Sequence, residues 1–307
     1  MPTSVSRTAE WGKRLLPHGT VKALQSTKHH VAVFVKRARW GFPQWRGPLL
    51  EPLHAWRQRR RPRPFPAATY ADTWLAASAA GRHVEPGESV ARRLFVVWTG
   101  DNAMPEQRRR SLDEIRRVNG VLDVVLVTPD TIGDWLVPEL ALPPQYEHLS
   151  LVHRSDVLRA YLLHVHGGGY SDVKRPREPW LGAYERLEQS GAWILGYTER
   201  HRLNAPLVGG RLQQDLRSVS QQLLGYGGLV VRPRTALTEE WWTRVCAVLD
   251  DNTDALAANP GNVRGDNPGY PLGWTEVLAH VVAPLTWKYQ DHVLHDERVL
   301  PELRNYQ

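Results

Sequence analysis

The sequence predicts an α/β fold in which a mostly parallel β-sheet is flanked by helices. Two short apolar runs, residues 94–98 and 121–127, have the composition of buried parallel strands. A charge-rich segment with the signals of a helix, residues 105–118, separates them. Because strand–helix–strand units of this length join parallel strands, both runs are expected in one sheet.

The first of these strands ends at Trp98 and is followed by a turn that begins at Thr99, and the second leads into the turn-rich loop 128–131. Between them, Pro105 suits the first turn of the helix. In open parallel sheets, ligands bind beyond the carboxyl ends of the strands. Trp98 and Thr99 are therefore the first candidates for contact with a nucleotide, although a Trp at a strand end often only packs.

Residues 150–177 contain the most informative pattern. Apolar residues recur at helical spacing from Val157 to Val165, which predicts a helix with a buried stripe. Asp156 and Arg159 are three residues apart, so they are expected as neighbours on the other side of that helix. The glycines at 167–169 end the helix, and residues 170–173 are expected to form a strand that delivers Asp172 to its tip.

The second half predicts two more strands, residues 191–196 and 226–233, and an amphipathic helix over residues 237–249. Open loops are expected at residues 259–262 and 265–269. Residues 270–275 are expected to enter a helix that runs to about Val282. On the acceptor side of a site, weak candidates are Trp242, Asp266 and Trp274. Of the adjacent Trp241 and Trp242, either could stack on an acceptor sugar, and one is expected in the core.

Length and composition set the outer limits. The chain has 307 residues, of which 42% are hydrophobic, enough for one large domain with an extension. Its net charge of +7 favours an anionic partner. The single cysteine, Cys246, excludes an intrachain disulfide and fits a reducing compartment. No run has the length of a membrane span and no secretory signal opens the chain, so a cytoplasmic location is expected.

The first ninety residues differ from the rest in being rich in Trp, Pro and Arg. We expect residues 1–90 to form a basic extension and residues 91–307 to form the domain. The run at 57–66 is basic and is interrupted by prolines. Either it is a solvated linker, or it joins Trp40, Trp45 and Trp56 in a patch that binds an anionic membrane surface.

The motif region resembles the Asp-x-Asp sugar-transferase superfamily, which includes capsular polysaccharide synthesis proteins, yeast initiating alpha-mannosyltransferases and the glucosyltransferase domains of clostridial toxins. The resemblance extends over about residues 93–295. The residues that carry it are Ser155, Asp156, Arg159, Gly168, Gly169, Tyr170 and Asp172.

The resemblance implies a GT-A-like fold and a retaining glycosyltransferase with a nucleoside-diphosphate sugar as donor and a glycan or other hydroxyl as acceptor. It implies that Asp156 and Arg159 hold the donor sugar and phosphate, and that Asp172 is the first Asp of the motif. The implied donor-binding set is Trp98, Thr99, Asp156, Arg159, Gly168, Gly169, Tyr170 and Asp172. The candidate catalytic residues are Asp172 and Arg159, which match the family motif, and Lys174, which is nominated for its charge and not by the resemblance.

The sequence departs from the family pattern at Lys174, where the second Asp normally ligates a divalent metal. A protonated lysine repels a metal but can place an ammonium beside a diphosphate, with Arg159 or Arg175 helping. Two hypotheses follow. Either the enzyme is metal-independent or weakly dependent on Mn²⁺ or Mg²⁺, with Asp172 as the only expected ligand, or the site is inactive. A retaining route requires no dedicated general base, so none is nominated.

Three functions remain open from the sequence. The first is glycosyl transfer to a cell-surface or capsular glycan. The second is a catalytically degenerate nucleotide-sugar-binding or scaffold protein on the same fold. The third is nucleic-acid binding, which only the net charge favours and which no recognition motif supports. The donor sugar, the nucleotide and the acceptor are not determined by the sequence, because variable loops form such pockets.

Overall fold

A computed structural model of the protein describes residues 55–58, 60–199 and 202–303. The chain divides into two compact units, residues 1–57 and 58–307, and the second contains the sheet. The expectation of a membrane-binding patch at Trp40 and Trp45 lies outside the described residues. The strands are β1 (Arg93–Val97), β2 (Asp123–Val127), β3 (Gly168–Ser171), β4 (Ile194–Thr198), β5 (Leu224–Val231) and β6 (Val293–His295). The helices are α4 (Glu106–Val118), α5 (Leu151–Val165), α6 (Leu181–Glu188), α7 (Gly210–Ser218), α8 (Ala236–Asp250), α9 (Thr253–Ala258) and α10 (Ala279–Lys288).

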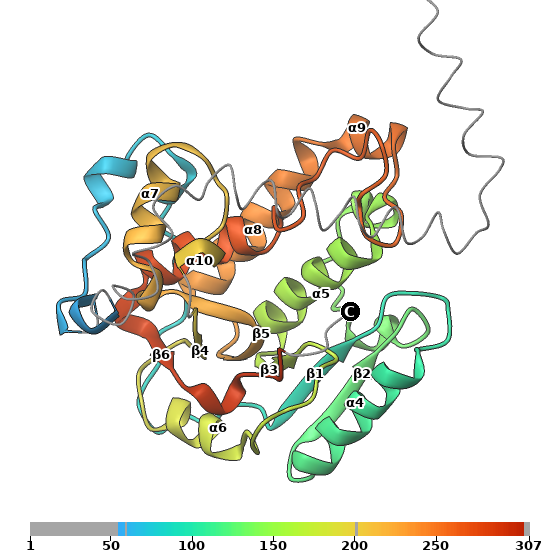
Figure 1. Ribbon diagram of the computed structural model, residues 1–307, viewed down its shortest axis with the longest axis horizontal. Coiled ribbons are helices and arrows are strands. Elements are labelled where there is room, and N and C mark those ends of the chain that lie inside the picture. Colours follow the sequence, from blue (N-terminus) through green and yellow to red (C-terminus); the bar gives the residue numbers. More distant parts are fainter. Residues whose placement is uncertain (1–54, 59, 200–201, 304–307) are drawn as a thin grey trace, which may run out of the picture. The chain divides into compact units, whose positions relative to one another are not determined.

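The six strands form one sheet in the order β2-β1-β3-β5-β4-β6 (Figure 1). β1 pairs in parallel with β2 and with β3, and β4 pairs in parallel with β6. β5 lies between β3 and β4 and runs antiparallel to both. The predicted α/β class with a mostly parallel sheet is therefore confirmed, and β1, α4 and β2 form the predicted strand–helix–strand unit.

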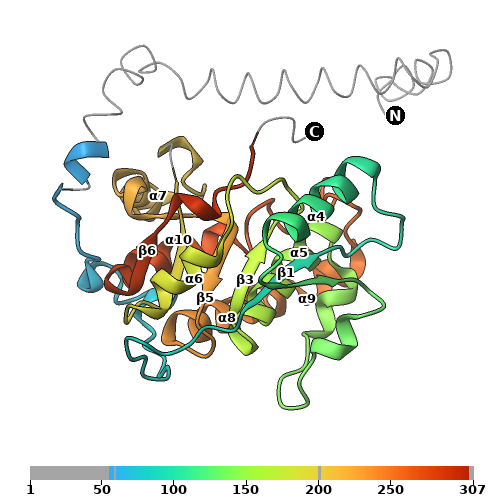
Figure 2. The same ribbon diagram turned by 90° about the horizontal axis from the view of Figure 1, so that it is seen from below.

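Helices cover both faces of the sheet because side chains alternate along each strand. Leu94 and Val96 of β1 pack in one apolar cluster with residues of α4 and α6. Phe95 and Val97 belong to a second cluster with residues of α5, α8 and α10. Figures 1 and 2 show α4 and α6 on one side of the sheet and α5, α8 and α10 on its far side. The helix that carries Asp156 and Arg159 is thus an inner element of the fold.

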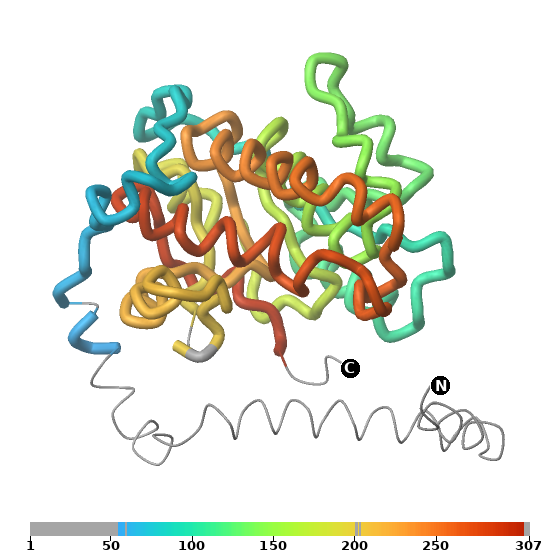
Figure 3. Tube along the Cα trace, turned by 90° about the horizontal axis from the view of Figure 1, so that it is seen from above, coloured from blue at the N-terminus to red at the C-terminus, as the bar shows by residue number. Residues whose placement is uncertain are grey.

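Residues 60–90 pack on this core and belong to the unit that contains the sheet. Phe65 stacks on Tyr70 with ring centroids 5.4 Å apart and meets the Trp287 ring of α10 edge-on at 5.2 Å. The Tyr70 hydroxyl donates a hydrogen bond to Asp215 of α7 at 2.7 Å. Figure 3 lets the reader follow this segment beside α10 and α7. The start of the unit at Gln58 does not coincide with the boundary expected at residue 90.

Other expectations differ from the structure in detail. The run 121–127 was expected as a buried strand, but β2 is an edge strand with Val124 and Val125 only half-buried. The helix expected to follow residues 270–275 and to run to about Val282 begins only at Ala279 and ends at Lys288. The chain before it forms turns in which the Gly273 N–H donates to the Glu276 carboxylate. Within the described ranges, no helix is long and apolar enough to cross a membrane.

Candidate functional site

The turn between α5 and β3 places two elements of the site. Ser150 caps α5, its hydroxyl accepting the His153 N–H. The helix ends at Val165, and Gly167 and Gly168 then have φ of +64° and +86°, a conformation that other residues rarely adopt. This turn brings the chain into β3, which pairs with β1 on one side and β5 on the other. Asp172 follows directly at the carboxyl end of β3, as the sequence predicted.

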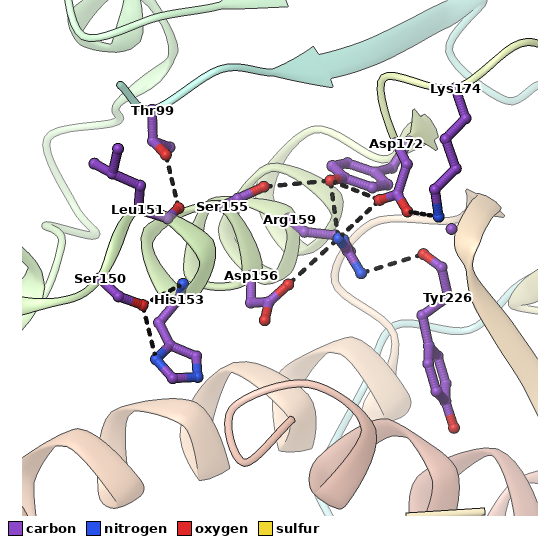
Figure 4. Close-up of polar contacts among 12 residues, drawn as sticks. Thr99, Ser150, Leu151, His153, Ser155, Asp156, Arg159, Asp172, Lys174 and Tyr226 are labelled. Carbon is purple, nitrogen blue, oxygen red and sulfur yellow. Dashed lines mark hydrogen bonds and ion pairs between the residues drawn. The ribbon is translucent and has the colours of Figure 1, made fainter. Parts of the chain in front are cut away.

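Arg159 is at the centre of the site (Figure 4). Its side chain is 6% exposed, and its guanidinium lies over the Tyr170 ring at 4.1 Å. Nη2 is 2.9 Å from the Tyr170 hydroxyl, 3.2 Å from Asp172 Oδ1 and 3.3 Å from Asp156 Oδ1. Nη1 donates to the Tyr226 carbonyl oxygen at 3.2 Å. Arg159 therefore joins α5, β3 and β5 through one buried cation.

A second cation contacts the other oxygen of Asp172. Lys174 Nζ lies 2.8 Å from Asp172 Oδ2, while Arg159 contacts Oδ1. Burial by itself raises the pKa of Asp172, but Lys174 and then Arg159 more than offset it and hold the pKa below its usual value. Asp172 is therefore ionised at neutral pH, with both oxygens in contact with positive charge.

These contacts do not fit a divalent metal. A metal on Asp172 would have to displace Lys174 or Arg159 and would be repelled by both charges. In the part of the chain that the structure describes, no three or more His, Cys, Asp or Glu side chains are grouped to hold a metal ion. One donor of the site has no protein partner in those same ranges, namely the buried Nε of Arg159, and such groups in native proteins commonly bond water or a ligand.

Asp156 contacts a single cation, Arg159, whereas Asp172 contacts both Arg159 and Lys174. Burial raises the pKa of Asp156 to about 7, Arg159 opposes this rise, and the charge of Asp172 adds to it. Near neutral pH, this carboxyl group thus exists both as a hydrogen-bond acceptor and as a protonated donor. The two carboxyl groups of the site have different charge states because their numbers of cation contacts differ.

The raised pKa of Asp156 predicts a specific pH dependence of stability. Its pKa is about 7 in the folded chain and near 4 in the unfolded chain, so folding favours the protonated form. This contribution is fully present below pH 4 and is lost as the pH rises through 7. Between pH 5 and 8, we expect the free energy of unfolding of the unchanged protein to fall by ~1–3 kcal/mol relative to that of the Asp156→Asn variant. Urea unfolding of both proteins measures it, and parallel pH profiles would contradict it.

Trp98 and Thr99 lie at the carboxyl edge of the sheet, but their polar groups bond within the protein. The Thr99 hydroxyl donates to the Leu151 carbonyl oxygen at 2.7 Å, and Trp98 Nε1 donates to the Asn102 carbonyl oxygen at 3.1 Å. Thr99 thereby fixes the end of β1 to the first turn of α5. A contact of either residue with a donor nucleotide stays a prediction.

Gly168 and Gly169 do not open towards a ligand. Both are buried at the start of β3, the end opposite Asp172. A Cβ on Gly168 would lie 2.7 Å from the Arg93 carbonyl oxygen, and one on Gly169 would collide with the Tyr184 hydroxyl. These glycines permit close packing of β3 against β1 and α6. Their burial gives no support to the expected contact with the donor, which stays a prediction.

The three acceptor-side candidates have different positions. Trp242 is 5% exposed and packs edge-on against Tyr161 of α5, with ring centroids 5.3 Å apart, which gives its expected contact with an acceptor no support. Trp274 is 58% exposed, and Asp266 is exposed with Oδ1 accepting a hydrogen bond from Asn262 at 2.7 Å. Both lie between α9 and α10, and their roles stay predictions.

Sequence reasoning missed two contributors. Tyr226 supplies only its backbone carbonyl to Arg159, and a backbone contact leaves no side-chain signal in the sequence. His153 lies one turn before Asp156 on α5 and is fully buried. Its spacing of three residues from Asp156 was the available signal, since residues at that spacing share a helix face.

Comparisons with known proteins give little further information. No protein-family model matches the sequence, and no curated protein matches it significantly. Among solved structures, the PaToxG glycosyltransferase is similar over 80% of each chain, with 10% sequence identity and a TM-score of 0.39. Values this low support neither a family assignment nor a shared activity.

Proposed function

We propose that this protein is a glycosyltransferase that moves a sugar from a nucleoside-diphosphate sugar to a hydroxyl group. One observation carries the proposal: the buried Arg159 guanidinium contacts Asp156 and Asp172 together, and Lys174 contacts the same Asp172 at the carboxyl edge of the sheet. Cations and carboxylates at one place suit a ligand that presents both phosphate oxygens and sugar hydroxyls. The carboxyl edge is also where ligands of open α/β sheets bind.

The residues divide the chemical work as follows. Transfer breaks the bond between the anomeric carbon and the diphosphate oxygen and forms one from that carbon to the acceptor oxygen. The proton of the acceptor hydroxyl leaves with the diphosphate. Lys174 and Arg159 stabilise the negative charge that grows on the departing diphosphate, which fixed cations do without reorganising. Asp156 and Asp172 accept hydrogen bonds from hydroxyls of the sugar or ribose. The ring and hydroxyl of Tyr170 fix the orientation of the Arg159 guanidinium.

Finer features of the proposal rest on the sequence resemblance. They are retention of the anomeric configuration, a cell-surface or capsular glycan as acceptor, donor contacts by Trp98 and Thr99, and acceptor contacts by Asp266 and Trp274. A chemistry independent of divalent metal is also part of the proposal, and the contact of Lys174 with Asp172 supports it. A cytoplasmic location, either at a membrane surface or away from one, is part of it too.

A second function has one observation in its favour. Lys174 and Arg159 satisfy both oxygens of Asp172 within the protein, as a structural ion-pair network would. A degenerate nucleotide-sugar-binding protein on the same fold would keep these contacts without turnover. Such a protein would be stabilised by a nucleoside diphosphate but would release none from a sugar nucleotide.

The test is hydrolysis of a panel of UDP-, GDP- and dTDP-sugars in buffer that contains manganese, with nucleoside diphosphate release as the readout. We expect slow release from one donor, because water replaces the missing acceptor. In the Asp172→Asn variant, we expect release to fall by about 100-fold or more. The matched control is Asp215→Asn on α7, because Asp215 also accepts a hydrogen bond from a tyrosine hydroxyl and contacts two arginines.

Three outcomes distinguish the glycosyltransferase from the degenerate binding protein and from a protein without a donor site. Release that Asp172→Asn abolishes and Asp215→Asn leaves intact supports the transferase. Thermal stabilisation by one donor without release supports the degenerate binding protein. Neither release nor stabilisation with any donor overturns the assignment of a donor site.

A further inference from the structure

A polar cluster around the buried His153, at the start of α5, lies outside the contacts of Arg159. It contains Ser150, His153, Tyr270 and the backbone of Gly273, and His153 has no exposed surface. His153 Nδ1 is 2.7 Å from the Tyr270 hydroxyl, and Nε2 is 3.1 Å from the Gly273 carbonyl oxygen. The two rings also stack, with centroids 5.5 Å apart. A histidine of α5 thus binds two points of a segment more than a hundred residues later in the chain.

One tautomer satisfies the contacts of the His153 ring with both Tyr270 and Gly273. With the proton on Nε2, His153 donates to the Gly273 carbonyl and accepts from the Tyr270 hydroxyl at Nδ1. The Tyr270 hydroxyl in turn accepts the Ser150 N–H at 3.2 Å. Burial lowers the pKa of His153, which agrees with a neutral ring. Each buried polar atom of the two side chains therefore has a partner, and loss of either side chain leaves orphaned groups.

The loop formed by residues 261–276, hereafter the 261–276 loop, is fixed to α5 by this cluster. Its Gly261 N–H donates to the His148 carbonyl oxygen at 2.9 Å, just before the helix. Gly265 has a φ of +70°, and a Cβ there would lie 2.7 Å from the Tyr270 ring. The loop therefore packs closely around Tyr270, and Tyr270 is held by His153. The same loop contains Asp266 and Trp274, the remaining acceptor-side candidates.

The cluster lies next to the proposed donor site. His153 and Asp156 are three residues apart on α5, and Figure 4 shows both side chains on the side of the helix that faces away from β1. The charge of Asp156 also contributes, after burial, to the raised pKa of Tyr270, which places the two side chains in electrostatic reach. The 261–276 loop is thus fastened one helical turn from the Asp156 carboxyl group.

We propose that His153 is a positioning residue whose hydrogen bonds hold the 261–276 loop beside Asp156, where the loop forms a wall of the pocket for the sugar ring of the donor. This inference rests on the proposed function for the identity of the ligand. His153 acts through Tyr270 and does not touch the reacting atoms. A loosened loop leaves Arg159, Asp172 and Lys174 in place, so binding of the donor weakens more than the chemical step.

The attachment of the loop is tested without any substrate. Arg264 is exposed within the loop, so trypsin reports how firmly the loop is held. Tyr270→Phe removes one hydroxyl, and His153→Phe removes both hydrogen bonds of the ring. We expect cleavage after Arg264 to be about 5- to 20-fold faster in both variants, and His153→Gln, which keeps a donor for Gly273, to restore part of the protection. The control is His166→Phe, which loses one hydrogen bond to Trp135 at the other end of α5.

The role in the pocket is tested with the donor that the unchanged protein hydrolyses. For Tyr270→Phe, we expect KM for that donor to rise about fivefold or more with kcat within about twofold, the signature of lost binding that is equal in the ground state and the transition state. Unchanged cleavage after Arg264 in both variants overturns the attachment. Faster cleavage with an unchanged KM overturns the role as a pocket wall. Absence of hydrolysis by the unchanged protein counts against the proposed function and with it against the pocket wall, while the trypsin result still decides the attachment.

Discussion

Replacing Arg159 by alanine is expected to lower the free energy of unfolding by ~3–5 kcal/mol and to abolish hydrolysis of the donor. The loss in stability follows because Asp156 would remain in the interior without its cationic partner, and Asp172 would keep only Lys174. The Tyr226 carbonyl and the Tyr170 hydroxyl would also lose their donor. Urea unfolding at pH 8, where both carboxyl groups carry charge, measures the loss.

Two further variants make this prediction specific. Arg211→Ala removes an exposed arginine that contacts Asp215, and a solvated pair of that kind contributes only about 0–1 kcal/mol. Arg159→Lys keeps a cation but not the planar set of contacts, so it should recover part of the stability and little of the activity. A loss below about 1 kcal/mol in Arg159→Ala would show that the buried pairs do not hold the site together.

Replacing Lys174 by alanine is expected to slow release of nucleoside diphosphate by about 100-fold while the protein stays folded. The ammonium is the positive group nearest to Asp172 Oδ2, and its loss removes a fixed charge from the place where the diphosphate would leave. Because Asp172 keeps Arg159 as a partner, the effect on stability should be far smaller than that of Arg159→Ala. Release rates and urea unfolding of the same protein samples measure the two effects.

A change of charge at the same position sharpens the test. Lys174→Asp places a second carboxylate two residues after Asp172, the spacing of the motif that the sequence resembles. We expect this variant to be inactive in EDTA and to recover part of the activity with manganese. Arg177→Ala, an exposed basic residue of the same loop, should behave as the unchanged protein does. Full activity of Lys174→Ala would exclude a catalytic role for the lysine.

The elements that the sequence predicted well are those defined by neighbouring residues. The β1–α4–β2 unit and the turn from α5 into β3 follow from apolar runs, Pro105 and Gly167, all of which act within a few positions. The order of the sheet could not be predicted in the same way. Insertion of β5 between β3 and β4, antiparallel to both, depends on pairing between segments that are far apart in the chain.

In the candidate site too, the features set by neighbouring residues were predictable and those set by long-range contacts were not. Asp156, Arg159 and Asp172 lie together as the motif implied, because a single helix and the strand that follows it determine their places. The tryptophans of α8, Trp241 and Trp242, are both buried, at 0% and 5% exposed, although adjacent residues of a helix point about 100° apart. Only the packing of α8 against its neighbours decides this, and the sequence does not contain that information locally. Trp242 proved to be buried against Tyr161. The contact of His153 with Tyr270 joins residues 117 positions apart, and no local sequence pattern predicts such a pair.

The most direct measurement is the rate at which the unchanged protein releases nucleoside diphosphate from its preferred donor, in EDTA and in manganese. If Lys174 and Arg159 supply the positive charge that the leaving diphosphate requires, the two rates should agree within about threefold. Activity that appears only with manganese would contradict this account. It would mean that a metal displaces Lys174 from Asp172, and that the ion pair between them is a feature of the resting site rather than part of the chemistry.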